Sequence, residues 1–113
     1  MLINKIFKKI EKQINKNIIL LYIKGTPELP VCGFSNKALQ IMYKCTKNFS
    51  YINVLEDNEI RKALPKFGNW PTFPQLWINK KLIGGCDIIT EMYNCNELQI
   101  LIKKTLKNHK INN

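Results

Sequence analysis

The clearest candidate for chemistry in this chain is the cysteine of the run Cys32-Gly33-Phe34-Ser35. The run has the spacing of a C-x-x-C redox motif, in which the first thiolate attacks a disulfide and the second cysteine resolves the mixed disulfide. Ser35 stands in the place of the second cysteine, and a hydroxyl cannot perform that second step. The motif therefore predicts a single thiol that acts as a nucleophile or as a soft metal ligand.

The elements on either side of Cys32 are expected to favour its thiolate form. The apolar run from Ile18 to Ile23 is typical of a strand buried on both faces, and a loop rich in Pro and Gly follows over residues 25–30. Apolar residues at helical spacing then predict a helix from about Ser35 to Lys47, with Ser35 or Asn36 available as its cap. The positive end of that helix lies next to the thiol and favours a negative charge on it.

Three further groups are expected to surround this thiol. Lys24 ends the first strand, and Phe73 precedes Pro74, where a cis bond would expose backbone groups of Phe73 to an extended peptide. Cys86 and Asp87 follow two glycines at the start of a helix. There the backbone amides could bind a carboxylate and the Asp87 side chain could bind an ammonium group. Together the groups predict a pocket for a small zwitterionic peptide with a thiol. Each has a plainer explanation too: a surface lysine, core aromatics or a helix cap.

The remaining pattern predicts an α/β domain with a four-stranded mixed central sheet flanked by helices. Further helices are expected over residues 2–16, from 57–59 to 67–68, from Asp87 as N-cap to 93, and over 97–107. Further strands are expected over 51–55, 75–78 and 82–83, the last two joined by a turn. We expect one domain, residues 1–113, with a frayed tail from about 108.

Composition narrows the function classes. The net charge of +10 arises because seventeen lysines and one arginine, Arg61, outnumber eight acidic residues. Because the basic residues are spread along the chain and are nearly all lysine, they indicate a solvated basic surface more than a specific nucleic-acid-binding site. No signal sequence or apolar run long enough to cross a bilayer is visible, so we expect a cytoplasmic protein without a membrane partner. The cysteine spacing does not favour a structural zinc site or a disulfide framework.

The other cysteines have separate expectations. Cys45 lies on the apolar side of its helix and is expected to be a small buried side chain, and Cys95 is expected in a surface turn without a role. Cys86 is expected to offer a backbone contact, or alternatively to form a disulfide with Cys32 when small thiols are scarce.

The sequence resembles the monothiol glutaredoxins of the Cys-Gly-Phe-Ser class, of the bacterial single-domain type. The resemblance extends from the first predicted helix to about Lys107. It is carried by motifs in family order, including the six residues between Gly25 and Cys32. The motifs are Lys24-Gly25-Thr26-Pro27, Pro30-Val31-Cys32-Gly33-Phe34-Ser35, Asn69-Trp70-Pro71-Thr72-Phe73-Pro74-Gln75-Leu76 and Gly84-Gly85-Cys86-Asp87-Ile88.

The resemblance implies a thioredoxin fold with Pro74 in cis and a glutathione site. In that site Lys24 and Arg61 would meet the glycine carboxylate, and Phe73 would pair through its backbone. Cys86 and Asp87 would hold the γ-glutamyl end. Arg61 has independent support, because a chain that otherwise uses lysine has an arginine where a bidentate carboxylate contact suits one.

The resemblance also implies a homodimer that shares one 2Fe-2S cluster, with Cys32 of each subunit and two glutathiones as ligands. Four thiolates are the usual ligand set, and one chain supplies one. The leading hypothesis is thus a carrier in iron-sulfur cluster biogenesis, with apo iron-sulfur proteins and BolA-like proteins as partners. The first alternative is a glutathione-dependent thiol-disulfide oxidoreductase, for which slow turnover is expected. The second is an adaptor without a cofactor.

Overall fold

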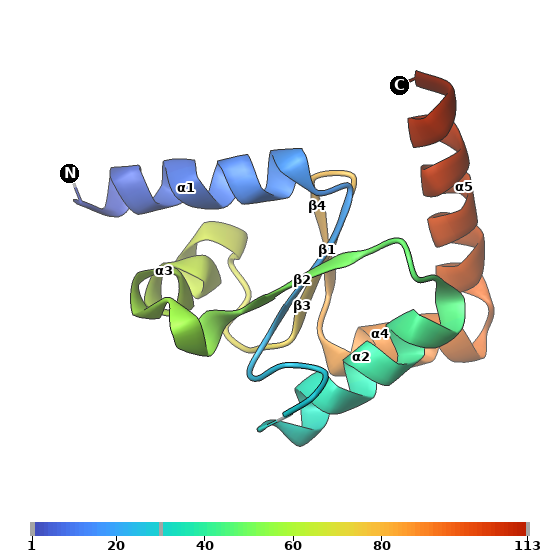
Figure 1. The fold of residues 1–113 in the computed structure, drawn as a ribbon, viewed down its shortest axis with the longest axis horizontal. Helices are drawn as coiled ribbons and strands as arrows, with labels where there is room; N and C mark the ends of the chain where they lie inside the picture. Colours follow the sequence, from blue (N-terminus) through green and yellow to red (C-terminus); the bar gives the residue numbers. More distant parts are fainter. Residues whose placement is uncertain (1, 30, 113) are drawn as a thin grey trace.

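A four-stranded mixed sheet in the order β2-β1-β3-β4 organises the chain (Figure 1). The structure is a computed structural model that describes residues 2–29 and 31–112, with the backbone alone at 111 and 112. β1 pairs parallel with β2 and antiparallel with β3, and β3 pairs antiparallel with β4. The strands are β1 (Ile19–Ile23), β2 (Ser50–Asn53), β3 (Gln75–Ile78) and β4 (Lys81–Gly84).

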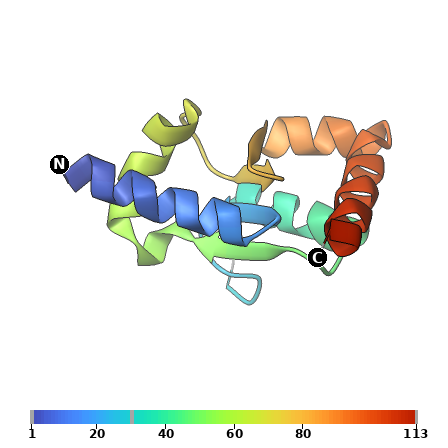
Figure 2. The ribbon, with the colours of Figure 1, turned by 90° about the horizontal axis from the view of Figure 1, so that it is seen from above.

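Helices cover both faces of this sheet (Figures 1 and 2). Two of them pack on one face and three on the other, which divides the core into two clusters. On the first face lie α1 (Leu2–Lys16) and α3 (Asn58–Gly68), with the short helix η1 (Val54–Glu56) beside α3. On the second face lie α2 (Gly33–Cys45), α4 (Cys86–Asn94) and α5 (Glu97–Asn112).

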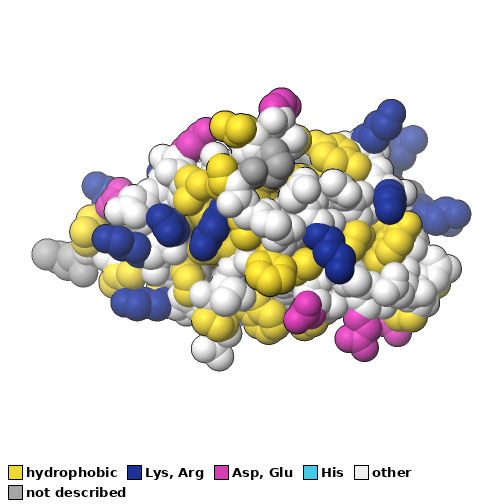
Figure 3. All heavy atoms as spheres, turned by 90° about the horizontal axis from the view of Figure 1, so that it is seen from below, with side chains coloured by type: hydrophobic (Ala, Val, Ile, Leu, Met, Phe, Trp, Pro, Cys, Tyr) yellow, Lys and Arg dark blue, Asp and Glu magenta, His cyan; other side chains and the backbone are white. Residues whose placement is uncertain are grey.

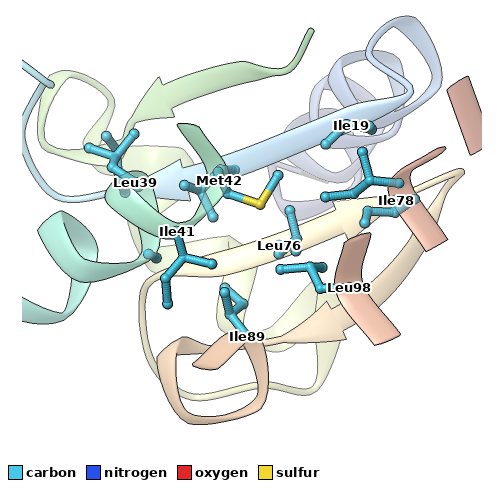
Figure 4. Close-up of a cluster of buried hydrophobic side chains, with 12 residues drawn as sticks. Ile19, Leu39, Ile41, Met42, Leu76, Ile78, Ile89 and Leu98 are labelled. Atoms are coloured by element: carbon cyan, nitrogen blue, oxygen red, sulfur yellow. The ribbon is translucent and has the colours of Figure 1, made fainter. Parts of the chain in front are cut away.

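The two covered faces explain why β1 is apolar at every position. Leu20 and Tyr22 pack toward α1 and α3, whereas Ile19 and Leu21 pack with side chains of α2, α4 and α5. Figure 4 shows this second cluster, with Ile19 labelled. All five β1 residues are buried, as expected for a strand covered on both sides. The Tyr22 hydroxyl donates to Oε1 of Gln13 at 2.8 Å, so the buried phenol keeps a hydrogen bond.

The predicted strands and helices are all present, but two predicted caps are wrong. The N-cap of α2 is Cys32 and not Ser35 or Asn36, because Ser35 is buried inside the first turn with its hydroxyl bonded elsewhere. The N-cap of α4 is Gly85, and Asp87 lies in the first turn of that helix.

Element ends also differ from the sequence pattern. β2 ends at Asn53, whose side-chain oxygen accepts from the backbone N–H of Leu55 and Gly25 at 3.0 and 2.9 Å and so turns the chain into η1. α5 continues to Asn112, beyond the predicted end at 107. In the predicted loop 25–30, Thr26 and Leu29 exchange two backbone hydrogen bonds of 3.2 Å, and Pro30 lies outside the described residues. None of the helices within the described ranges is long and apolar enough to cross a membrane.

Candidate functional site

A cavity of about 710 Å³ opens at the end of the sheet where β1 ends and β3 begins. Figure 3 views the molecule from that side, and it shows hydrophobic side chains across the middle of the face with basic side chains beside them. All six residues predicted for the site line this cavity, although they come from five separate segments. They are Lys24, Cys32, Arg61, Phe73, Cys86 and Asp87.

Cys32 is half-buried at the N-terminus of α2 and has a lowered pKa. Burial by itself raises the pKa of this thiol. Hydrogen bonds from Ser35 and Phe34 to the sulfur and the charge of Lys24 act in the opposite direction, and they prevail. The thiolate is therefore favoured at this position, as the sequence predicts, and the causes are local donors at the helix start.

Ser35 has a structural use that the sequence did not reveal. Its side chain is fully buried, and its Oγ accepts a hydrogen bond of 3.0 Å from the backbone N–H of Lys24. Its hydroxyl also bonds to the sulfur of Cys32. The residue in the place of a resolving cysteine therefore joins the end of β1 to the thiol, and it offers no second sulfur.

Two basic side chains reach the same cavity. Lys24 follows the last residue of β1, and Arg61 lies in the first turns of α3. The start of α3 is held by Asp57, whose Oδ1 accepts from the backbone N–H of Ile60 at 3.1 Å. A 2.6 Å ion pair with Lys9 and this cap hold the pKa of Asp57 below its usual range. The cap fixes the helix that carries Arg61 to the cavity.

The third wall of the cavity is the segment from Trp70 to Pro74, with the predicted cis bond between Phe73 and Pro74. Gln75, for which the sequence predicted no role of its own, anchors this segment from within the core. Its fully buried side chain donates to the carbonyl of Trp70 at 3.0 Å and accepts from Nε1 of Trp77 at 3.2 Å. A glutamine at the start of an otherwise apolar strand is the signal that could have revealed this role.

The start of α4 forms the fourth wall and packs tightly on the third. A Cβ added to Gly85 would lie 3.2 Å from the carbonyl oxygen of Pro74 and 3.2 Å from Nε1 of Trp70. That indole nitrogen is buried and has no hydrogen-bond partner within the described part of the chain. Cys86 is buried and Asp87 is exposed at this wall. Glycine at position 85 thus permits the two segments to meet.

The other cysteines lie away from the cavity. Cys45 is partly buried against the core, and burial raises the pKa of its thiol. Cys95 is exposed at the C-cap of α4, with its sulfur 3.6 Å from the carbonyl oxygen of Met92. No cluster of three or more His, Cys, Asp or Glu side chains that could hold a metal ion occurs among the described residues. Among the described residues, Cys32 therefore belongs to no group of three such side chains.

Comparison with solved structures identifies the fold. The chain superposes on the reduced apo GrxS14 of poplar with a TM-score of 0.75 and 37% identity, covering 88% of this chain and 91% of that chain. The holo form of glutaredoxin C1 from Populus tremula x tremuloides gives a TM-score of 0.81 at 22% identity, with 92% of each chain covered. This architecture is the thioredoxin fold, as the sequence resemblance implied.

Comparison at the sequence level identifies the family. The glutaredoxin family model matches residues 19–83. Glutaredoxin 4 of Buchnera aphidicola subsp. Acyrthosiphon pisum is 58% identical over 104 residues, which cover 92% of this chain and 96% of that protein. Glutaredoxin 4 of Escherichia coli strain K12 is 53% identical over 103 residues, 91% of this chain and 90% of that protein. The chain belongs to the glutaredoxin family.

Proposed function

We propose that this chain is a monothiol glutaredoxin that binds a 2Fe-2S cluster as cargo and transfers it during iron-sulfur cluster biogenesis in the cytoplasm. The observation that carries the proposal is the environment of Cys32. A single thiol with a lowered pKa borders a cavity with basic and acidic walls, and Ser35 supplies no resolving sulfur. Such a thiolate suits a soft metal ion, and the Cys32–Ser35 motif itself provides no second sulfur for dithiol exchange.

Glutathione is the proposed co-ligand, and the cavity matches its charges. Lys24 and Arg61 would meet the glycine carboxylate, and the backbone of Phe73 would pair with the cysteinyl unit. Cys86 and Asp87, at the start of α4, would hold the γ-glutamyl end, where backbone amides and a carboxylate suit a zwitterion. A buckwheat glutaredoxin of the same fold, 20% identical, has been solved as a glutathione complex, which supports glutathione as the ligand.

The ligand count favours a homodimer. Four thiolates complete the usual ligand set of a 2Fe-2S cluster, and Cys32 is one. A second subunit and two glutathiones would supply the other three. Exposed apolar side chains next to the thiol, Leu29, Val31 and Phe34, suit a subunit contact around it. Two exchangeable ligands would make the cargo labile, which suits delivery to apo iron-sulfur proteins or to a complex with a BolA-like protein.

The lowered pKa of Cys32 also favours a second function, deglutathionylation of proteins. The Cys32 thiolate would attack the glutathione sulfur of a mixed disulfide, releasing the protein as a thiolate and forming a Cys32-glutathione disulfide. A glutathione thiolate would then attack that disulfide, giving oxidised glutathione and restoring the Cys32 thiolate. One cysteine is sufficient for both steps.

Anaerobic reconstitution with iron, sulfide and glutathione, followed by visible absorption, tests the first function. We expect a coloured, glutathione-dependent species that Cys32→Ser abolishes and Cys95→Ser retains. A coupled assay with a glutathionylated peptide tests the second, and we expect slow turnover. Fast turnover that Cys32→Ser abolishes, together with a colourless protein after reconstitution, would reverse the order of the two functions.

A further inference from the structure

The end of the sheet opposite Cys32 carries two adjoining hollows of about 460 and 300 Å³. They share Ile18 and His109. Their lining residues come from the junction of α1 and β1, the segment that leads into β2, the turn from β3 to β4, and α5. Figure 1 shows these elements. The glutaredoxin site lies at the other end of β1. The proposed cargo function does not use this end of the molecule.

Four lysines from four separate segments line the two hollows. Lys16 ends α1, Lys47 lies between α2 and β2, Lys80 lies in the turn from β3 to β4, and Lys104 lies in α5. No aspartate or glutamate lines either hollow. Among the described residues, none of these four ammonium groups forms an ion pair with a carboxylate; the ion pair present there joins Lys9 and Asp57. An unneutralised cluster of this kind attracts anions.

The turn that carries Lys80 has a defined backbone conformation. Asn79 and Lys80 both have left-handed backbone conformations, with φ of 50° and 69°, and the backbone N–H of Asn79 donates to the carbonyl of Ile18 at 2.8 Å. The turn is thereby tied to the start of β1. Neutral side chains that can donate and accept hydrogen bonds lie between the lysines. They are Asn15, Asn17, Asn48, Ser50, Asn79, Thr105 and Asn108.

Helix stabilisation explains only part of this arrangement. A lysine in the last turn of a helix interacts favourably with the helix dipole, and Lys16 has that position in α1. Lys80 lies in a strand-to-strand turn and Lys104 lies in the middle of α5, where no helix C-terminus requires a cation. Their convergence with Lys47 on one carboxylate-free surface needs another reason.

We propose that this surface, the basic end, binds a carboxylate-rich segment of a partner protein. Its lining has no arginine, whose planar guanidinium group would form bidentate hydrogen bonds with phosphates or bases. Its one Phe, Tyr or Trp ring is Phe49, which is partly buried against the core and packs edge-on against Tyr43 with the ring centroids 5.0 Å apart, so the lining offers no row of such rings on which successive bases could stack. Lysine ammonium groups among amides suit single carboxylates, so an acidic peptide fits better than a nucleic acid.

The basic end and the Cys32 cavity are far enough apart to be occupied at the same time. The five residues of β1 lie between them, which corresponds to about 17 Å at the usual rise per residue. A partner held at the basic end would therefore leave Cys32 and its cavity open. The basic end could hold an acidic protein while the thiol site exchanges its ligand, whichever function the thiol site has.

The test measures binding of a fluorescein-labelled oligoglutamate peptide to the full chain by fluorescence anisotropy, at about 50 and 150 mM salt. The test variant combines Lys16→Gln, Lys47→Gln, Lys80→Gln and Lys104→Gln. The matched control combines Lys5→Gln, Lys8→Gln, Lys12→Gln and Lys62→Gln, which remove the same charge from exposed positions outside both hollows. Circular dichroism verifies that both variants are folded.

We expect the test variant to bind the peptide roughly tenfold more weakly, as four lost charge pairs imply, and the control variant to bind nearly as the native chain does. In a ¹H–¹⁵N titration of the native chain, the amides of Asn79, Lys80 and Lys104 should shift. Equal weakening in both variants, or no binding at the lower salt concentration, would overturn the proposal. Tighter binding of a single-stranded DNA probe that displaces the peptide from the basic end would also overturn it.

Discussion

The backbone N–H of Lys24 donates a hydrogen bond of 3.0 Å to the hydroxyl oxygen of Ser35, and Cys32 lies between these two residues in the sequence. Ser35 is fully buried, and its hydroxyl also bonds to the sulfur of Cys32. One side chain therefore satisfies a backbone donor at the end of β1 and contributes to the lowered pKa of the thiol. The hydroxyl at the fourth position of this motif therefore has a specific structural use in this chain.

Ser35→Ala should destabilise the fold. The backbone N–H of Lys24 would lose its acceptor in a part-buried position, which costs about 1–3 kcal/mol of the free energy of unfolding. Urea unfolding followed by circular dichroism measures the change. Asn36→Ala is the control, because Asn36 does not cap α2, and it should change stability by less than about 0.5 kcal/mol. Equal losses in both variants would show that Ser35 has no special role.

Cys32 should react with iodoacetamide at a lower pH than an ordinary thiol. A lowered pKa means that the thiolate persists as the pH falls, so the midpoint of its rate profile should lie below that of an ordinary cysteine thiol. Cys45 should titrate higher, since burial raises its pKa. Peptide-level mass spectrometry gives both profiles in one sample. Lys24→Met should move the Cys32 midpoint upward, and an ordinary midpoint for Cys32 in the native chain would contradict the assignment.

Much of the site could be predicted from sequence because each contributing segment is local. An all-apolar run predicts a strand covered on both faces, and Phe73-Pro74 before β3 predicts the cis bond, both of which the structure confirms. The convergence of Lys24, Cys32 and Asp87 on one cavity also agrees with the predicted order of elements.

The parts that could not be predicted depend on contacts between distant segments. Serine is a residue type typical of helix N-caps. The Ser35 hydroxyl, however, accepts a hydrogen bond from the backbone N–H of Lys24 at the end of β1, and the N-cap of α2 is Cys32. Gln75 anchors the Trp70 segment only because that segment folds back over the core. Side-chain type alone does not reveal such tertiary hydrogen bonds.

Gly85→Ala should disturb the cavity, whereas Gly33→Ala should be tolerated. A Cβ at Gly85 would press on Pro74 and Trp70 at 3.2 Å, and a Cβ at Gly33 would meet nothing within 4 Å. We expect a loss of about 1–3 kcal/mol in the free energy of unfolding for Gly85→Ala, because the crowded segments must separate. Gly33→Ala should stabilise the helix start by up to about 1 kcal/mol.

Thermal or urea unfolding of the two glycine variants measures these stabilities, and calorimetric titration with glutathione measures the effect on the cavity. Glutathione should bind Gly85→Ala more weakly than the native chain and Gly33→Ala about equally. Unchanged stability and affinity in Gly85→Ala would show that the contact between the Trp70–Pro74 segment and α4 is not needed.

Arg61→Met should weaken glutathione binding, because Arg61 lines the cavity and would meet the glycine carboxylate. The loss of hydrogen bonds to a charged group costs about 1.5–3 kcal/mol, which corresponds to an increase of roughly tenfold or more in the Kd for glutathione. Calorimetric titration measures this Kd. Lys62→Met removes the same charge from an exposed position outside the cavity and should have little effect. Arg61→Lys should recover only part of the loss, since lysine lacks the bidentate fork. Equal effects at 61 and 62 would argue against a contact by Arg61.

The most direct test of the central claim is native mass spectrometry of the chain after anaerobic reconstitution with iron, sulfide and glutathione. The account predicts a species with the mass of two chains, one 2Fe-2S cluster and two glutathiones, and its loss in Cys32→Ser. Colour and dimer mass should also disappear when glutathione is omitted. A folded monomer without iron, or a cluster-bound species of any mass that forms without glutathione, would contradict the claim that Cys32 and glutathione together hold the cargo.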